Sequence, residues 1–155
     1  MRASPPLACR DAMPASFAID VSRRLVLSRG WGVLSVEELM HHVRALPLDP
    51  RFSPGFRQLI DLTEVSGLDL DAEDLRRVAA LNPFGRGARR AVAVTNDEVY
   101  GMARMYEMVR PPVGDELRIF RGLTPAVEWL GLADEESEVL VMLREAEELK
   151  VRSER

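Results

Sequence analysis

The sequence is poor in the residues that build disulfide frameworks, Cys-based metal sites and membrane spans. Its 155 residues include one cysteine, Cys9, so the chain can form neither an internal disulfide nor a Cys-based metal site. No apolar run approaches the roughly 18 to 20 residues that a bilayer-spanning helix needs. Residues 1–12 contain no sustained hydrophobic segment, which argues against a secretory signal. These absences predict a cytoplasmic protein of bacterial type with no transmembrane segment.

Candidate catalytic groups are also scarce. The two histidines, His41 and His42, are adjacent, so on a helix they point about 100° apart and cannot ligate one metal ion. No Gly-x-Ser-x-Gly elbow occurs, and Gly85-Arg86-Gly87 lacks the Gly-Lys-Ser/Thr of a phosphate-binding loop. The acids between Asp69 and Asp74 do not have EF-hand spacing. We therefore expect no enzymatic activity, no metal and no cofactor.

Charge is unevenly distributed along the chain. Residues 134–155 carry eight acids and four bases, whereas the rest of the chain carries 17 of each. A neutral body offers no large basic field for counterion release, so nucleic-acid binding is disfavoured.

Hydrophobic periodicity predicts an α/β domain. The central unit is an apolar strand from Arg57, a turn at Ser66-Gly67, and a helix from about Ala72 to Leu81. Strands that alternate with helices imply a four- to five-stranded sheet, mostly parallel, made mixed by an opening hairpin and packed by about four helices plus a tail helix. The other predicted strands are 17–21, 25–32, 89–95 and 117–120, and the other predicted helices are 36–46, 97–110, 125–130 and one in the acidic tail.

Capping signals fix several helix boundaries. Ser35 with Glu38 forms a capping box, Asn96 precedes the third helix, and Thr124 is an expected N-cap before Pro125. Two helices show apolar stripes. They comprise Val99, Met102, Ala103, Tyr106 and Val109 in the third helix, and Val139, Met142, Leu143, Ala146 and Leu149 in the tail.

The expected organisation is one domain with two extensions. Residues 1–15 contain three prolines and no periodicity, which predicts a flexible leader, and Met13 is an alternative start. Residues 16–132 form the domain, and residues 133–155 form an acidic amphipathic helix. This helix packs either on its own domain or on another chain, since its apolar stripe needs cover.

Four parts of the chain match the pattern of a known family in order and spacing: Asp61-Leu62-Thr63 and the helix start after it, the hairpin from Ile19 to Leu27, residues 101–107, and Ile119-Phe120 followed by residues 126–130. Through these stretches, residues 17–132 resemble the SpoIIAA-like (STAS/Sec14-like) family of small bacterial proteins. The resemblance implies a STAS-type architecture and a role in regulation or ligand binding.

One position departs from the pattern of the phosphorylated family members. Aligning Asp61 with the family's strand aspartate places Asp71 where those proteins carry the serine that a partner kinase modifies. Aspartate cannot accept the phosphate, and its single charge only partly imitates a phosphate of about −1.5 to −2. Asp71 is therefore either a plain N-cap, with Asp74 in the first turn, or a permanent recognition charge.

Two further sets of residues are candidates for binding. The flexible thioethers Met102, Met105 and Met108, with Tyr106 and Trp129, suit core filling, an apolar ligand pocket or a dimer surface. Arginines near the fourth strand and third helix are either a solvated rim or a local anion site; they are Arg86, Arg89, Arg90 and Arg104.

Three functional hypotheses follow. The first is a non-enzymatic regulatory module that contacts a protein partner through Ser66, Asp69, Asp71 and Asp74, with the third helix or tail supporting a homodimer. The second is a carrier of a small apolar ligand or lipid headgroup, as the Sec14-like relatives imply. The third is nucleotide binding near the same helix start.

Overall fold

The computed structural model describes residues 15–153, with side chains described as far as Ala146. The predicted leader and the alternative start at Met13 lie outside the described residues, apart from Ala15, which is the first residue of a strand. Leu149 of the predicted tail stripe also lies outside the described side chains.

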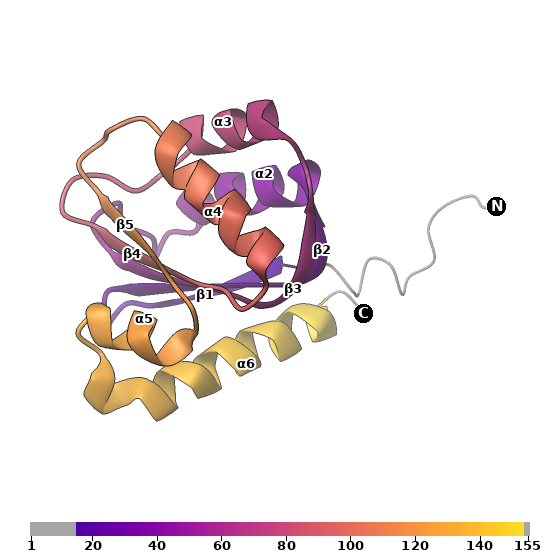
Figure 1. Cartoon of the computed structure of the whole chain (residues 1–155). Helices are drawn as coiled ribbons and strands as arrows, with labels where there is room; N and C mark the ends of the chain where they lie inside the picture. The colour runs from indigo at the N-terminus through magenta and orange to yellow at the C-terminus, as the bar shows by residue number, and fades with distance from the viewer. Residues whose placement is uncertain (1–14, 154–155) are drawn as a thin grey trace.

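A five-stranded sheet forms the centre of the molecule (Figure 1). Its strands are β1 (Ala15–Asp20), β2 (Leu25–Ser35), β3 (Arg57–Asp69), β4 (Arg89–Ala93) and β5 (Glu116–Phe120), and they lie side by side in chain order. β1 runs antiparallel to β2, while β2 to β5 are mutually parallel. The predicted mixed, mostly parallel sheet with an opening hairpin is confirmed.

Helices cover both faces of the sheet (Figure 1). The first face carries α2 (Val36–Ala45), α3 (Ala72–Ala80) and α4 (Asp97–Val109), and the second carries α5 (Leu123–Trp129) and α6 (Glu136–Ser153). Two 3-10 turns, η1 (Leu46–Leu48) and η2 (Ala133–Glu135), complete the chain order. The predicted order of strands and helices is therefore confirmed.

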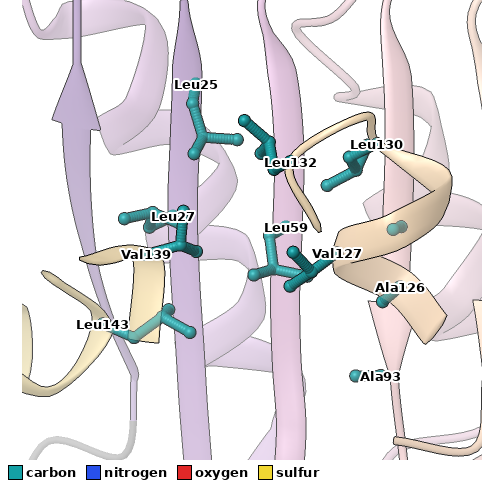
Figure 2. Close-up of a cluster of buried hydrophobic side chains, with 11 residues drawn as sticks. Leu25, Leu27, Leu59, Ala93, Ala126, Val127, Leu130, Leu132, Val139 and Leu143 are labelled. Atoms are coloured by element: carbon teal, nitrogen blue, oxygen red, sulfur yellow. The ribbon is translucent and has the colours of Figure 1, made fainter. Parts of the chain in front are cut away.

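The face covered by α5 and α6 is densely packed. Side chains of the two helices and their connection lie against Leu25, Leu27 and Leu59 of the sheet (Figure 2). These strand residues are fully buried, as are Val127 and Val139 above them. Small side chains of β4 let α5 approach closely, since Ala91 and Ala93 are also fully buried.

The predicted caps of α2 and α4 are present. Ser35 and Glu38 form a reciprocal capping box at the start of α2, and the Asn96 side chain accepts from Glu98 N and Val99 N at the start of α4. The predicted cap at Thr124 is wrong. α5 begins two residues earlier than predicted, after Gly122, which has a φ of 136°, and the Thr124 hydroxyl donates to Glu136 Oε2 at 2.7 Å instead.

The predicted turn at Ser66-Gly67 is also wrong, because β3 continues to Asp69. β2 extends with it to Ser35, through register shifts on either side of Trp31-Gly32 that let the two strands stay paired. Burial alternates along this extension, with Val65 and Gly67 inside and Ser66 outside. A Cβ added at Gly67 would lie 4.0 Å from Val33 Cγ2, an ordinary van der Waals distance, so packing alone does not require glycine here.

The acidic tail packs on its own domain. Val139, Leu143 and Ala146 of α6 are buried against the sheet, and Met142 is partly buried beside them. Polar contacts hold the start of the tail. Arg23 pairs with Glu135 and, at 3.2 Å, with Glu138. Arg57 Nη1 donates to the carbonyl oxygen of Leu130 at 2.8 Å, just before the tail begins.

Candidate functional site

A cavity of about 140 Å³ lies between the sheet and helices α2, α3 and α4. Its wall is almost entirely apolar and combines side chains from the sheet with side chains from all three helices. The sheet contributes Leu34, Ile60, Leu62, Val92 and Leu117, and the helices contribute Leu39, Val43, Leu75, Val78, Val99, Met102, Ala103 and Tyr106.

The cavity exists because two helices stand away from the sheet. α2 has an apolar face toward the sheet, yet none of its residues is buried, and Val99 is the only buried residue of α4. Leu39 and Tyr106 are therefore only partly covered, although they pack beside the core cluster of Leu34, Val65 and Val92. In the opposite layer, by contrast, α5 and α6 have several fully buried apolar residues, among them Val127 and Val139.

One end of the cavity is polar. His42, Gln58 and Arg90 line it, and a chain of hydrogen bonds connects them beneath the helices. Arg90 Nε donates to Gln58 Oε1 at 2.8 Å, and Gln58 Nε2 donates to Ser28 Oγ at 2.9 Å. Ser28 Oγ lies 2.9 Å from His42 Nε2.

The direction of this chain follows from the chemistry of its members. A guanidinium only donates, so the oxygen of the Gln58 amide must face Arg90 and its nitrogen must face Ser28. The Ser28 oxygen then accepts from Gln58, which leaves its proton free to be donated to His42 Nε2 when that nitrogen is unprotonated. Each member of the chain thereby fixes the orientation of the next.

Asp115 anchors the same network from the start of β5. Its carboxylate accepts from Arg110 Nη1 at 2.7 Å, from Arg90 Nη1 at 3.1 Å and from Asn82 Nδ2 at 3.1 Å. The side chain is fully buried, and burial by itself opposes ionisation. The hydrogen bonds from Arg110, Arg90 and Asn82 outweigh it and hold the pKa of Asp115 below its ordinary value. The cluster therefore carries two cations and one anion.

The contact between Ser28 and His42 has the distance of a catalytic nucleophile and base, and sequence reasoning did not find it. Ser28 is 3 % exposed and does not line the cavity. Its oxygen already accepts from Gln58. The geometry therefore fits a structural hydrogen bond that positions His42 rather than a nucleophile that meets a substrate.

The structure separates the five residues predicted for a pocket or dimer surface. Met102 and Tyr106 line the cavity. Met105 and Met108 face outward, with 37 % and 79 % of their surface exposed. For these two residues the dimer surface therefore stays a prediction. Trp129 lies on the opposite face of the sheet, where it packs against Phe120. A single pocket lined by all five is therefore wrong, because α4 and α5 cover different faces.

The four arginines predicted as an anion site are not brought together. Arg90 is buried in the network, while its neighbour Arg89 points to the other face and lies over the Trp129 ring at 4.1 Å. Alternation along β4 causes this separation. Arg86 is exposed, and Arg104 pairs with Glu107 on the outer surface of α4 at 3.5 Å.

The comparison with solved structures identifies the fold. The chain is similar to an uncharacterized protein from the DUF3478 family, with a SpoIIAA-like fold, from Shewanella loihica PV-4. The two are 23 % identical, with a TM-score of 0.51 over 75 % of this chain and 93 % of that one. This chain has a SpoIIAA-like fold. No family model and no curated protein matches the sequence.

In this SpoIIAA-like fold, Asp71 is the N-cap of α3. Its carboxylate accepts from Asp74 N at 2.9 Å, and Asp74 Oδ2 accepts from Asp71 N at 3.1 Å, which forms a reciprocal capping box. The bond from Asp74 N lowers the pKa of Asp71. The predicted cap is confirmed. Asp71 is also exposed, as are Ser66 and Asp69, so its role as a recognition charge stays a prediction.

Asp61, the strand aspartate of the resemblance, is buried at 5 % exposure. Its Oδ1 accepts hydrogen bonds from both N and Oγ1 of Thr63, at 3.0 and 2.6 Å. The aspartate and the threonine of the Asp-Leu-Thr sequence are therefore hydrogen-bonded to each other. Within residues 15–153, no group of three or more potential ligands is arranged to hold a metal ion. None of the helices in that range is long and apolar enough to cross a bilayer.

Proposed function

We propose that this protein binds a small, largely apolar molecule between helices α2, α3 and α4 and the sheet. The observation that supports this proposal is the cavity of about 140 Å³ with an apolar wall and a polar end. A site of this kind, mostly apolar with a few convergent polar groups, is typical of small-molecule binding.

The size of the cavity supports the same proposal. Protein interiors are packed as closely as organic crystals, and an apolar cavity of roughly 150 Å³ accommodates benzene. The cavity is partly open to solvent, so a molecule of this size can enter it, and burial of its apolar surface against the wall would stabilise the complex.

The proposed role is binding without catalysis, in the cytoplasm. In the pair with nucleophile and base geometry described above, Ser28 is buried and does not line the cavity, although His42 does.

Filling the cavity from α4 is expected to abolish binding. Ala103 lines the cavity, so Ala103→Phe would place a ring where the apolar part of the ligand lies. We expect wild-type protein labelled with ¹⁵N to bind 1-octanol saturably, with shifts at the amides of Val43, Ala103 and Tyr106. Ala103→Phe should weaken this binding by about 10-fold or more, because ligand and ring compete for one space.

Met108→Phe is the matched control, since it places the same ring on the same helix at a position that is 79 % exposed. It should bind 1-octanol as the wild type does. Saturable binding that Ala103→Phe leaves unchanged would contradict the proposed site, as would the absence of saturable binding to the wild type.

A second candidate function is protein recognition at the acidic start of α3. It is supported by the exposure of Ser66, Asp69 and Asp71 on the adjoining end of β3 and start of α3. Asp71→Asn tests it, because asparagine caps a helix as well as aspartate does but carries no charge. A partner that is retained by the wild type and by Glu73→Gln, and lost with Asp71→Asn, is the expected result. Equal retention by all three proteins would exclude a role for this charge.

A further inference from the structure

We infer that the ligand of the cavity is a monocarboxylate with a short apolar chain, whose carboxylate lies against Arg90 at the polar end. This inference rests on the proposed binding function and adds the chemical class of the ligand. Three features of the polar end carry it: the hydrogen bonds that Arg90 leaves unused, the net charge of the cluster, and the lack of acceptors for a cationic group.

Arg90 is buried, and its guanidinium has more donor groups than its hydrogen bonds to Gln58 and Asp115 use. The residue is 4 % exposed and lines the cavity, and its carbon Cζ lies 4.8 Å from the centre of the Phe84 ring. Its Nε donates to Gln58 and its Nη1 donates to Asp115. Within the described part of the chain, its Nη2 has no hydrogen-bond acceptor. Nη2 is not among the buried unpaired side-chain atoms of the described residues, so solvent reaches this donor and a ligand acceptor could take the place of water there.

The charge of the cluster selects an anion. Arg90 and Arg110 share the single carboxylate of Asp115, whose two oxygens accept from both arginines and from Asn82. Among the residues that the structure describes, one positive charge of this cluster is therefore left without a paired anion in a largely desolvated setting. No aspartate or glutamate is among the described residues that line the cavity. A ligand with one negative charge would balance the cluster, since buried charges are stable only when paired.

The hydrogen-bond directions disfavour a cationic or donor ligand. The oxygen of Gln58 already accepts from Arg90, and its nitrogen already donates to Ser28. Tyr106 also lines the cavity, on the turn of α4 before Arg110. The guanidinium of Arg90 offers only hydrogen atoms to a ligand, and a carboxylate is the acceptor that forms strong, charge-assisted bonds with it.

The apolar wall sets the size of the rest of the molecule. A volume of about 140 Å³ is close to that of a cavity that accommodates benzene, and because the cavity is partly open to solvent, the end of a longer chain can extend out of it. Medium-chain fatty acids and small aromatic acids combine an apolar part of this kind with a single carboxylate.

Three probes with the same eight-carbon chain test the inference on the intact wild-type protein: octanoate, 1-octanol and octylammonium. Titration calorimetry at pH 7 is expected to show octanoate binding at least about 10-fold more tightly than 1-octanol, as a charge-assisted hydrogen bond contributes more than a neutral one. Octylammonium is expected to bind more weakly than 1-octanol, because it meets the uncompensated positive charge.

Variants then assign the preference to Arg90. Arg90→Met keeps the length of the side chain and removes its donors, so octanoate should lose its advantage while 1-octanol still binds. Arg104→Met, on the exposed surface of α4, is the matched control and should keep the wild-type preference.

The results on the wild type test both the carboxylate assignment and the binding function on which it rests. Equal affinities for octanoate and 1-octanol would overturn the carboxylate assignment and leave the binding function standing. Tighter binding of octylammonium would overturn it as well. Binding of none of the three probes would overturn both.

Discussion

Replacing Asp115 with alanine is expected to lower the free energy of unfolding by about 3–5 kcal/mol. The side chain is fully buried and pairs with Arg90 at 3.1 Å and Arg110 at 2.7 Å. Without the carboxylate, two guanidinium groups that are 5 % and 14 % exposed lose their shared anion. Buried charges left unpaired are among the most destabilising features that a single substitution creates. Chemical denaturation of wild type and variant measures the difference.

Glu116→Ala is the matched control, because it removes a carboxylate from the adjacent residue. Glu116 also pairs with an arginine, Arg89, at 3.3 Å, but its side chain is 67 % exposed. Ion pairs at the surface contribute about 0–1 kcal/mol, so this variant should unfold close to the wild type. Similar losses for the two variants would show that the network around Asp115 contributes no more than a surface pair.

The pH dependence of the unfolding free energy of wild type and Asp115→Ala gives an independent readout of the same network. Hydrogen bonds from the two arginines and Asn82 prevail over burial and keep the pKa of Asp115 below its ordinary value of about 3.9. A group whose pKa is lower in the folded state contributes stability above its unfolded pKa, and this contribution is lost as the pH falls through the folded pKa. The gap between wild type and Asp115→Ala should therefore be constant near neutrality and should narrow below about pH 4.

Much of the fold could be predicted from the sequence, because local signals agreed with the final packing. The capping box at Ser35 fixes the start of α2, and the stripe containing Val139 and Leu143 identifies the face of α6 that is buried. The structure also answers a question that periodicity left open. A stripe shows that a helix face needs cover, and the position of β1 and β2 shows that this chain supplies it (Figure 1).

The errors at Ser66 and Thr124 have a common cause. Ser-Gly and Thr-Pro are good local signals for a turn and a helix start, but long-range pairing overrode them. The bulges near Gly32 keep β2 in register with β3 beyond Ser66. The Thr124 hydroxyl donates a hydrogen bond to Glu136, twelve residues further along the chain, so that its side chain does not cap α5.

The polar network at the cavity was mostly missed, since its members lie far apart in the sequence. They come from β2, β3 and β4, where Ser28 follows three apolar residues and where Gln58 and Arg90 are each the second residue of the strand and precede apolar residues. A polar residue next to the apolar part of a strand was a usable signal. Such residues need partners when they are buried, and the register of β3 and β4 pairs Gln58 with Arg90. An anion site at Arg90 was predicted from the sequence, but together with three arginines that lie elsewhere in the structure.

Leu143→Ala in α6 is expected to cost about 2–5 kcal/mol of unfolding free energy, the usual range for a leucine removed from a packed core. Leu143 is 3 % exposed and lies in the cluster with Leu27, Leu59 and Val139 (Figure 2). Val141→Ala is the matched control, because Val141 lies two residues away on the same helix and is 51 % exposed. Its effect should stay within about 0.5 kcal/mol. Equilibrium denaturation of both variants measures the contrast.

The same experiment at two protein concentrations separates packing within the chain from packing between chains. A helix that covers its own sheet gives an unfolding midpoint that is independent of concentration, whereas a helix exchanged with a second copy gives a midpoint that rises with concentration. We expect no dependence, because Arg23 holds Glu135 and Glu138 at the start of the tail within one chain. A concentration-dependent midpoint that Leu143→Ala abolishes would instead assign α6 to a dimer interface. Equal, small effects of the two substitutions would mean that α6 adds little to the stability of the sheet it covers.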